Sequence, residues 1–318
     1  MTDNIILVDA FAQIYRGFFA IPVLNNSQGQ PTNAILALMK FLLKIHQELP
    51  GSAGAFVFDC GKPAFRLELA PDYKANRPPM PDELSAQLPY VERAVAAFGW
   101  PAIRCEGYEA DDLIAAVAAD FADRNVRIVS SDKDLHQAVN ERVHMLVPGR
   151  DGSFDERGPA EVTAKFQVTP EQIVDYLSLI GDSSDNIPGV SGVGPKTAAN
   201  LLGQYGSLRA MLDHPEQIAN PRLRDKIIAA TPVLHRNPQL IRLKTSVPEA
   251  PWHHDVSCLC RRAPDWDAIR AIATELELKS LFRDIDAATA PAATVPPAPT
   301  VAGKVPAAPA PEQPDLFG

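Results

Sequence analysis

Carboxylates gather in this chain at the edges of apolar runs. The clusters Glu109-Ala110-Asp111-Asp112 and Asp132-Lys133-Asp134 bring five of them together within twenty-six residues. Acids packed together in a folded protein would repel one another unless cations neutralised them. Oxygen ligands with no histidine among them suit Mg²⁺ or Mn²⁺ better than zinc. The clusters therefore predict a site for divalent metal ions.

Short apolar runs, rich in β-branched and aromatic residues, lead into three of the acids. They are 5–8 before Asp9, 55–58 before Asp59, and 126–129 before Asp132. Separated by helix-like segments, such runs are typical of buried parallel strands in an α/β sheet. Ligands and catalytic groups of such sheets lie beyond the carboxyl ends of the strands, which is where these acids fall.

A further pair, Asp182 and Asp185, is three residues apart, a spacing that puts both on one side of a helical turn. Any single Asp at a strand end or helix start is more often a cap than a catalytic group. Nine acids in such positions exceed what capping requires, so we favour metal binding. The nine candidate metal ligands are Asp9, Asp59, Glu109, Asp111, Asp112, Asp132, Asp134, Asp182 and Asp185.

The remaining elements are expected from apolar periodicity and turn residues. Helices are expected over 32–48, 81–98, 113–121 and 265–276, and further strands over 101–105 and 142–147. Thr169-Pro170-Glu171-Gln172 has the cap, proline and Gln of a helix start, and this point begins a second, mainly helical domain.

Five motifs together resemble a known family. They are VDAFAQIYR, FDCGKPAFRLELAPDYKANRPPMPDEL, GYEADD, SSDKDLHQ and GDSSDNIPGVSGVGPKTAANLL. Over roughly residues 4–285 the chain resembles the 5′-nuclease family, which includes flap endonucleases and a domain of bacterial DNA polymerase I. The resemblance implies a mainly parallel central sheet flanked by helices, PIN/resolvase-like, followed by a smaller helical domain.

In function, the resemblance implies a structure-specific 5′-3′ exonuclease or flap endonuclease of replication and repair. Its substrates would be nicks, 5′ flaps and RNA-primed duplex, and its cofactors two Mg²⁺ ions, with Mn²⁺ as a substitute. One ion is expected to have the ligands Asp9, Asp59, Glu109 and Asp111. The other is expected to have Asp132, Asp134 and Asp185, with Asp112 and Asp182 nearby or bound through water.

Between Asp59 and about Pro81, cations alternate with aromatic residues and prolines. This composition suits a single strand of nucleic acid passing the site, although an ordinary solvated loop is an alternative. The resemblance implies an arch at about 62–81, in which Arg66 and Lys74 stabilise charge on the reacting phosphate and Arg77 contacts substrate.

Tyr15 and Arg16 follow the first strand. Core packing is the default for an aromatic residue at helical spacing. The resemblance favours stacking of Tyr15 on a base and assigns Arg16 to substrate binding.

The glycines of 189–194 allow a tight turn that brings backbone N–H groups against a phosphate, with a helix N-terminus behind it. A dinucleotide site would need a preceding strand, which is not expected here. The resemblance implies a helix-hairpin-helix that contacts DNA, and a monovalent cation, such as K⁺, held by two backbone carbonyls. The DNA contacts are assigned to Gly192, Gly194, Lys196 and Thr197, and the carbonyls to Val190 and Val193. For Lys196, simple solvation is the alternative.

Composition sets broad limits. The 318 residues are 46% hydrophobic, enough for two domains with cores. The formal charge of −9 is unusual for a DNA-binding protein. Without the nine candidate ligands, however, acids and bases balance, so DNA binding must depend on local basic clusters.

The ends of the chain and its cysteines indicate the compartment. No leader precedes the first strand, and the cysteines lack CxxC spacing, which predicts reduced thiols in a cytoplasmic, nucleoid-associated monomer. The cysteines are Cys60, Cys105, Cys258 and Cys260. A zinc site at Cys258 and Cys260 with His253 and His254 is disfavoured against alternation in a short strand.

Three regions are expected: a nuclease domain over 1–168, a DNA-binding domain over 169–286, and a disordered Ala/Pro linker from 287 to the end. No polymerase follows, so a free-standing nuclease is expected. The tail resembles the peptide by which bacterial replication proteins bind the sliding clamp. The clamp contacts are assigned to Gln313, Asp315, Leu316 and Phe317.

Two other functions were weighed. A binding or scaffolding protein of the same fold would have lost some of its acids, whereas this chain keeps all nine. A PIN-like ribonuclease would share the acidic sheet edge but would not need the glycine hairpin or the basic arch. The balance between exonuclease and flap cleavage stays open.

Overall fold

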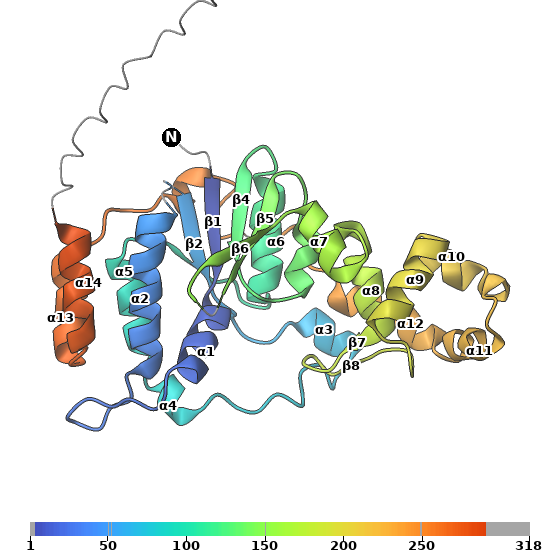
Figure 1. Cartoon of the computed structure of the whole chain (residues 1–318), viewed down its shortest axis with the longest axis horizontal. Coiled ribbons are helices and arrows are strands. Elements are labelled where there is room, and N and C mark those ends of the chain that lie inside the picture. The colour runs from blue at the N-terminus through green and yellow to red at the C-terminus, as the bar shows by residue number, and fades with distance from the viewer. Residues whose placement is uncertain (1–3, 50, 52, 150, 249, 291–318) are drawn as a thin grey trace, which may run out of the picture.

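A six-stranded sheet forms the centre of the computed structural model, which describes residues 4–49, 51, 53–149, 151–248 and 250–290 (Figure 1). Its strands are β1 Asn4–Asp9, β2 Ala53–Val57, β3 Ala102–Ile103, β4 Asn125–Val129, β5 Val143–Pro148 and β6 Phe154–Arg157. They are ordered β3-β2-β1-β4-β5-β6, and only β5 and β6 pair in antiparallel fashion. The expected mainly parallel sheet is confirmed.

Both faces of the sheet are covered by helices, which explains the unbroken apolar runs of its strands. Successive side chains of a strand point to opposite faces. Ile5 and Leu7 therefore enter the core shared with α6 (Ala110–Asp120) and α8 (Ile173–Ile180). Ile6 and Val8 enter the core on the other face. Its helices are α1 Ala10–Ala20, α2 Asn33–Glu48 and α5 Leu88–Ala97.

The helix expected over 81–98 is split into α4 (Asp82–Ser85) and α5. Gln87 stands at the break, fully buried. Its amide donates to the side chain of Asn33, and its Oε1 accepts the backbone N–H of Ile35. These bonds fasten the break to the first turn of α2.

The helical unit follows the sheet. The predicted start at Thr169 is confirmed, because Gln172 Oε1 accepts the Thr169 N–H at 3.1 Å in a capping box. After α7 (Pro159–Phe166), its helices are η2 Pro170–Gln172, α8 Ile173–Ile180, α9 Pro195–Tyr205, α10 Leu208–Asp213, η3 Pro215–Gln217, α11 Pro221–Ala229 and α12 Thr231–Ile241.

The helical turn expected at Asp182 and Asp185 is wrong. The residues lie instead on a hairpin of two short strands, β7 (Gly181–Asp182) and β8 (Ile187–Pro188). The Asp182 carboxylate accepts the N–H and hydroxyl of Ser184, a local bond that competes with helix formation. Gly189 permits the close packing, since a Cβ there would stand 2.3 Å from the Ile180 carbonyl carbon.

The last two helices, α13 (Trp266–Glu275) and α14 (Lys279–Thr289), pack against α5 and α2 on the sheet domain rather than on the helical unit (Figure 1). Apolar residues such as Ile269 and Leu281 bury in that core. The expected domain end at 286 therefore does not match the packing, and α14 continues through 287–289.

Cys258 lies in the 3₁₀ helix η4 (Val256–Leu259), not in a strand as expected, and Cys260 forms only an isolated bridge to Ala53. The linker and clamp peptide, from 291 on, fall outside the described residues. Within the described ranges, every helix is too short or too polar to cross a bilayer.

Candidate metal centre

A first group of acids lines a cavity of about 390 Å³ at the carboxyl edge of the sheet. Its members are Asp9, Asp59, Asp111 and Asp132. Asp9 ends β1, Asp59 and Asp132 follow β2 and β4, and Asp111 is in the first turn of α6. The parallel sheet thus brings together acids that are far apart in sequence.

Two of these acids also serve as caps. Asp9 Oδ1 accepts the Ala12 N–H at 3.0 Å, and Oδ2 accepts the Ser130 hydroxyl at 2.8 Å. Asp59 Oδ1 accepts the Ala110 N–H at 2.8 Å. Capping and lining the cavity are therefore compatible roles.

The protein environment disfavours negative charge in this group. Burial, with smaller contributions from Asp59 and Asp132, outweighs two hydrogen bonds and raises the pKa of Asp9 to about 7. Burial and the charges of Asp132, Asp9 and Asp59 raise the pKa of Asp111 well above its usual value. A divalent cation would reverse both effects, so the residues fit a metal.

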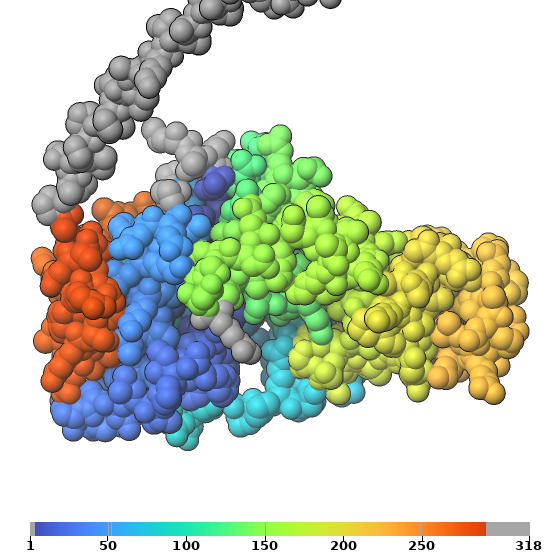
Figure 2. Space-filling model, viewed as in Figure 1, coloured from blue at the N-terminus to red at the C-terminus, as the bar shows by residue number. Residues whose placement is uncertain are grey.

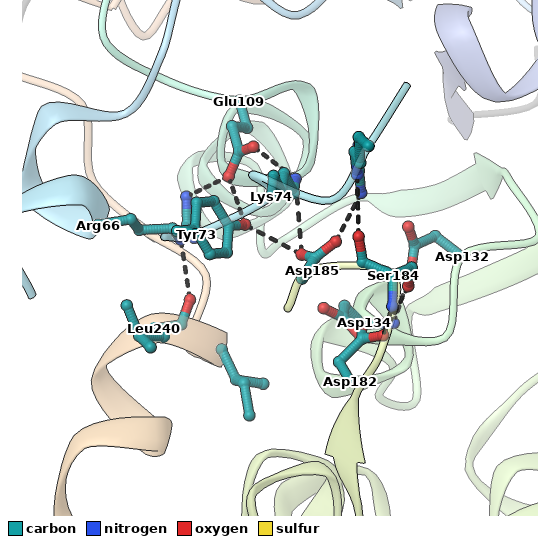
Figure 3. Close-up of polar contacts among 12 residues, drawn as sticks. Arg66, Tyr73, Lys74, Glu109, Asp132, Asp134, Asp182, Ser184, Asp185 and Leu240 are labelled. Atoms are coloured by element: carbon teal, nitrogen blue, oxygen red, sulfur yellow. Dashed lines mark hydrogen bonds and ion pairs between the residues drawn. The ribbon is translucent and has the colours of Figure 1, made fainter. Parts of the chain in front are cut away.

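A second group consists of Asp134, Asp182 and Asp185, each with one carboxylate oxygen within 4.8 Å of the others (Figure 3). Asp134 Oδ1 is buried and lacks a hydrogen-bond partner among the described residues. Burial and the neighbouring carboxylates raise the pKa of Asp134 well above its usual value. An orphaned, buried carboxylate oxygen is the feature that a metal ion would satisfy.

Cations of the protein surround this second group. Lys133 Nζ lies 2.9 Å from Asp182, and Arg77 Nη2 lies 2.6 Å from Asp185. Lys74 Nζ is 3.5 Å from Asp185 and also pairs with Glu109. Ser184 and Lys133 outweigh burial and lower the pKa of Asp182. Its charge is therefore already compensated.

Arg66 is placed differently from expectation. Only 2% of its side chain is exposed, and its guanidinium points into the protein (Figure 3). It makes a two-pronged ion pair with Asp112 at 2.5 and 2.7 Å and also reaches Glu109 at 2.8 Å. Its Nε donates to the Leu240 carbonyl at 2.8 Å. In this arrangement Arg66 ties α3 (Ala64–Leu69) to α6 and α12 and does not line the cavity of the first group.

Glu109 and Asp112, both expected near the ions, therefore have protein cations as partners. Neither lines the cavity of the first group. The Tyr73 hydroxyl lies 3.0 Å from both Glu109 and Asp185 and can donate to one at a time (Figure 3). Tyr73 thus connects the Arg66 network to the second group.

The segment 70–81 runs past Asp185 of the second group. The Lys74 N–H, at a φ of 55°, donates to the Asp185 carbonyl, and the Asn76 amide donates to the Ser183 carbonyl. These bonds attach the segment to the β7–β8 turn. The space-filling view shows an opening through the molecule between α1, in blue, and this segment, in cyan (Figure 2).

Tyr15, Lys74 and Arg77 line the cavity with the first group. The Tyr15 ring is stacked on that of Phe19, which is 72% exposed. Arg16 donates to the Gly149 carbonyl, so its guanidinium is engaged by the β5–β6 turn.

The glycine hairpin does not contribute to that cavity. Gly192 has a φ of +79° and is exposed, and Gly194 begins α9 without a side-chain cap. Lys196 is exposed and Thr197 half-buried in the first turn of α9. The Val190 carbonyl accepts the Val193 N–H at 2.9 Å.

Three residues near these sites had been given no role from sequence: Tyr73, Lys133 and Lys226. A Cβ at Gly192 would lie 2.8 Å from Lys226 Nζ, so this lysine stands against the hairpin from α11. Tyr73 could have been found as the aromatic residue beside Lys74. For Lys226 no local pattern indicates the contact.

A sheet that gathers carboxylates at one edge, joined to a helical unit with a glycine hairpin, defines the class of metal-dependent nucleases. Two family models match the chain: the 5′-3′ exonuclease N-terminal resolvase-like domain over residues 4–167, and the 5′-3′ exonuclease C-terminal SAM fold over 168–265. The chain therefore belongs to the 5′-3′ exonuclease family, a family of nucleases that act on DNA, and the resemblance noted from its motifs is confirmed.

Relatives and solved structures agree. The 5′-3′ exonuclease of Aquifex aeolicus is 36% identical over 88% of this chain and 94% of its own length. The thermostable DNA polymerase I of Thermus filiformis is 38% identical over 88% of this chain, but the match spans only 33% of the polymerase.

Two solved structures share the fold. T5 5′-exonuclease with bound divalent metal ions (zinc) matches with a TM-score of 0.62 at 23% identity, covering 89% of this chain and 98% of its own. The catalytic core of Rad2 in complex with DNA substrate matches with a TM-score of 0.61 at 18% identity, covering 90% and 91%.

Proposed function

We propose that this protein is a Mg²⁺-dependent 5′-3′ exonuclease and flap endonuclease that hydrolyses phosphodiester bonds near the 5′ end of nicked, flapped or RNA-primed DNA. The observation that carries the proposal is the pair of carboxylate groups, with Asp132 between them. Asp132 lines the first cavity, while the charges of Asp185 and Asp182 also raise its pKa. Two adjoining groups would hold two metal ions, which in two-metal sites lie ~3.5–4 Å apart.

The donor set supports the choice of metal. The first ion would be held by Asp9, Asp59, Asp111 and Asp132, and the second by Asp134, Asp182 and Asp185. Glu109 and Asp112 would act through water or through their charge. All donors are carboxylate oxygens, which suits Mg²⁺ or Mn²⁺. When bound, such ions would activate a water molecule and stabilise the leaving oxygen.

The cations of the cavity would act on the phosphate. Lys74 and Arg77 line it and are held by Glu109 and Asp185, so their charges are fixed close to the acids. Stabilising charge that develops on a transferring phosphate requires such fixed cations. Arg66 would position Glu109 rather than touch substrate, and Tyr15 would stack on a base beside the cavity.

Duplex DNA would lie on the glycine hairpin. Gly192 and Gly194 keep the turn open, and no side-chain cap covers the first N–H groups of α9, where Lys196 and Thr197 lie. A helix N-terminus of this kind favours phosphate. Lys226 would add a cation. The carbonyls of Val190 and Val193 would hold a K⁺ ion beneath the turn.

The test is cleavage of a 5′-flap, a nicked duplex, an RNA-primed duplex and a single-stranded RNA, with Mg²⁺ or with EDTA, and products sized on a gel. We expect cutting near the 5′ ends of the first three in Mg²⁺ and none in EDTA. Asp134→Asn should slow cutting on the order of a thousandfold while DNA still binds. Cleavage of the RNA strand alone would favour a PIN-like ribonuclease instead.

The tail would connect this activity to replication. The segment from 291 on, which lies outside the described residues, would keep a monomeric nuclease at high effective concentration on nucleoid DNA in the cytoplasm. Gln313, Asp315, Leu316 and Phe317 would bind the sliding clamp. Deleting 313–317 should abolish clamp binding and leave cleavage of flaps intact, and unchanged clamp affinity would dispose of this role.

A further inference from the structure

Lys133 has no role in the function proposed above, although it stands between two candidate ligands at the start of η1 (Asp134–Ala138). Its Nζ lies 2.9 Å from Asp182 Oδ1. The Lys133 side chain is 37% exposed, whereas that of Asp182 is 4% exposed. The ammonium group therefore stands at the solvent side of the second group and reaches back to a buried carboxylate.

The carboxylate that Lys133 contacts belongs to a set. Asp182 is one of three acids whose carboxylate oxygens lie within 4.8 Å of one another. The ammonium group therefore lies beside the acids that would hold the second metal ion. A cation in this place neutralises some of the negative charge that the metal ion would otherwise neutralise.

The hydrogen bonds of the group are uneven. Asp182 Oδ1 accepts from Lys133 and also from the N–H and hydroxyl of Ser184, at 2.9 and 2.5 Å. Asp134 Oδ1 belongs to the same group but has no hydrogen-bond partner among the described residues. An ion that bound Asp134, Asp182 and Asp185 together would have to share Asp182 with the ammonium group or displace it.

We propose that Lys133 is an internal counter-ion of the second group, which neutralises Asp182 in the metal-free protein and shares or gives up that carboxylate when a divalent ion binds all three acids. The inference rests on the proposed function, since it requires a metal ion at this group. Two like charges this close oppose each other, so Lys133 weakens metal binding here and the second group fills after the first.

The test is Mn²⁺ binding to the full-length protein without DNA, followed by the electron paramagnetic resonance signal of free Mn²⁺. In the variant Lys133→Met the weaker site should tighten by about tenfold, and the tighter site should keep its affinity. Lys133→Arg keeps the charge and should resemble the unchanged protein. Lys44→Met is the matched control, because Lys44 pairs with Glu48 at 2.9 Å and is 29% exposed, yet lies on α2 away from the acids.

A second measurement follows Lys133 in the unchanged protein and needs only the charge-conserving variant for assignment. In the unchanged protein labelled with ¹³C at lysine Cε, the Lys133 signal, assigned by its loss in Lys133→Arg, should shift with Mg²⁺ as the weaker site fills. An unshifted Lys133 signal, or a weaker site that fails to tighten in folded Lys133→Met, would overturn the proposal.

Asp134→Asn distinguishes this failure from failure of the proposed function. If the unchanged protein binds two Mn²⁺ ions and Asp134→Asn removes the weaker one, the metal site stands and only the role of Lys133 is in question. If the unchanged protein binds no Mn²⁺, the proposed function itself fails.

Discussion

The two carboxylate groups differ in what compensates their charge. In the first, Asp9 and Asp111 have raised pKa values because burial and neighbouring acids oppose ionisation. In the second, Lys133 pairs with Asp182, and Arg77 and Lys74 pair with Asp185. The first group therefore depends on ions from solution, whereas much of the second is neutralised by the protein.

This difference shows how a protein can gather many acids at one edge of a sheet and still fold. The cations that pair with these acids lie on the segment 70–81 and at the start of η1. Around the first group, the strand ends bring acids and the caps of helices, and Lys74 and Arg77 of the same segment line the cavity.

The largest expected effect is that of Asp111→Asn. It removes a buried acid whose pKa is raised well above its usual value by burial and the neighbouring acids, so turnover on a 5′-flap should fall on the order of a thousandfold. DNA affinity, measured by fluorescence anisotropy in EDTA, should not decrease. Near-normal turnover would remove the first group from the mechanism.

Arg66→Met tests the network behind the first group. Removing the buried guanidinium leaves Asp112 as an unpaired buried charge, which should lower the free energy of unfolding by about 3–5 kcal/mol in urea denaturation. Arg93→Met is the control, because the pair of Arg93 with Glu275 is about half exposed and should contribute less than about 1 kcal/mol. Equal losses in the two variants would contradict the structural role of Arg66.

The pH dependence of stability should separate Asp9 from Asp182. Because the pKa of Asp9 rises from 3.8 to about 7 on folding, its stabilising contribution is complete below pH 3.8 and is lost as the pH rises through 7. In EDTA the Tm should therefore fall between these pH values, and Mg²⁺ should abolish the fall. Asp182, whose pKa is lowered, should contribute in the opposite sense, with stability lost only in more acidic solution.

A variant Asp9→Asn provides the control for this pH effect. It should show a smaller fall of Tm with rising pH in EDTA than the unchanged protein. An identical fall in both would show that the ionisation of Asp9 does not limit the stability of the metal-free protein.

The smallest expected effect is that of Tyr73→Phe, which removes the hydroxyl between Glu109 and Asp185. One hydrogen bond to a charged group contributes about 1.5–3 kcal/mol, and the remaining cations should limit the loss to the lower end. Urea denaturation measures the stability, and turnover should fall only severalfold. A loss of activity as large as that of Asp111→Asn would make Tyr73 a part of the mechanism.

The sheet edge was predictable from sequence. Asp9, Asp59 and Asp132 each follow an apolar run, and in a parallel sheet the ends of such runs meet at one edge. That inference needs only local patterns and one rule of topology. It predicts that these three acids lie close together without any information about the loops.

The partners of Arg66 were not predictable in this way. Its neighbours in sequence indicated a solvated segment, but Asp112 comes from α6 and the Leu240 carbonyl from α12. Local composition does not record such contacts. The spacing of Asp182 and Asp185 was ambiguous for a different reason, since a helical turn and a side-chain-capped turn both bring residues three apart together.

The sequence also did not predict which domain the last two helices would pack against. The apolar stripe of α13 predicts a packed helix, yet any apolar face in either domain could have received it. In the structure α13 packs against α5 and α14 against α2, so the apolar surfaces of these two helices determine that the chain returns to the sheet domain.

The central claim is that the two groups each bind a divalent ion, and anomalous diffraction from crystals soaked in Mn²⁺ tests it most directly. The account predicts two peaks, one among Asp9, Asp59, Asp111 and Asp132, and one among Asp134, Asp182 and Asp185. A map with no peak at either group, from crystals in which these acids are ordered, would contradict it.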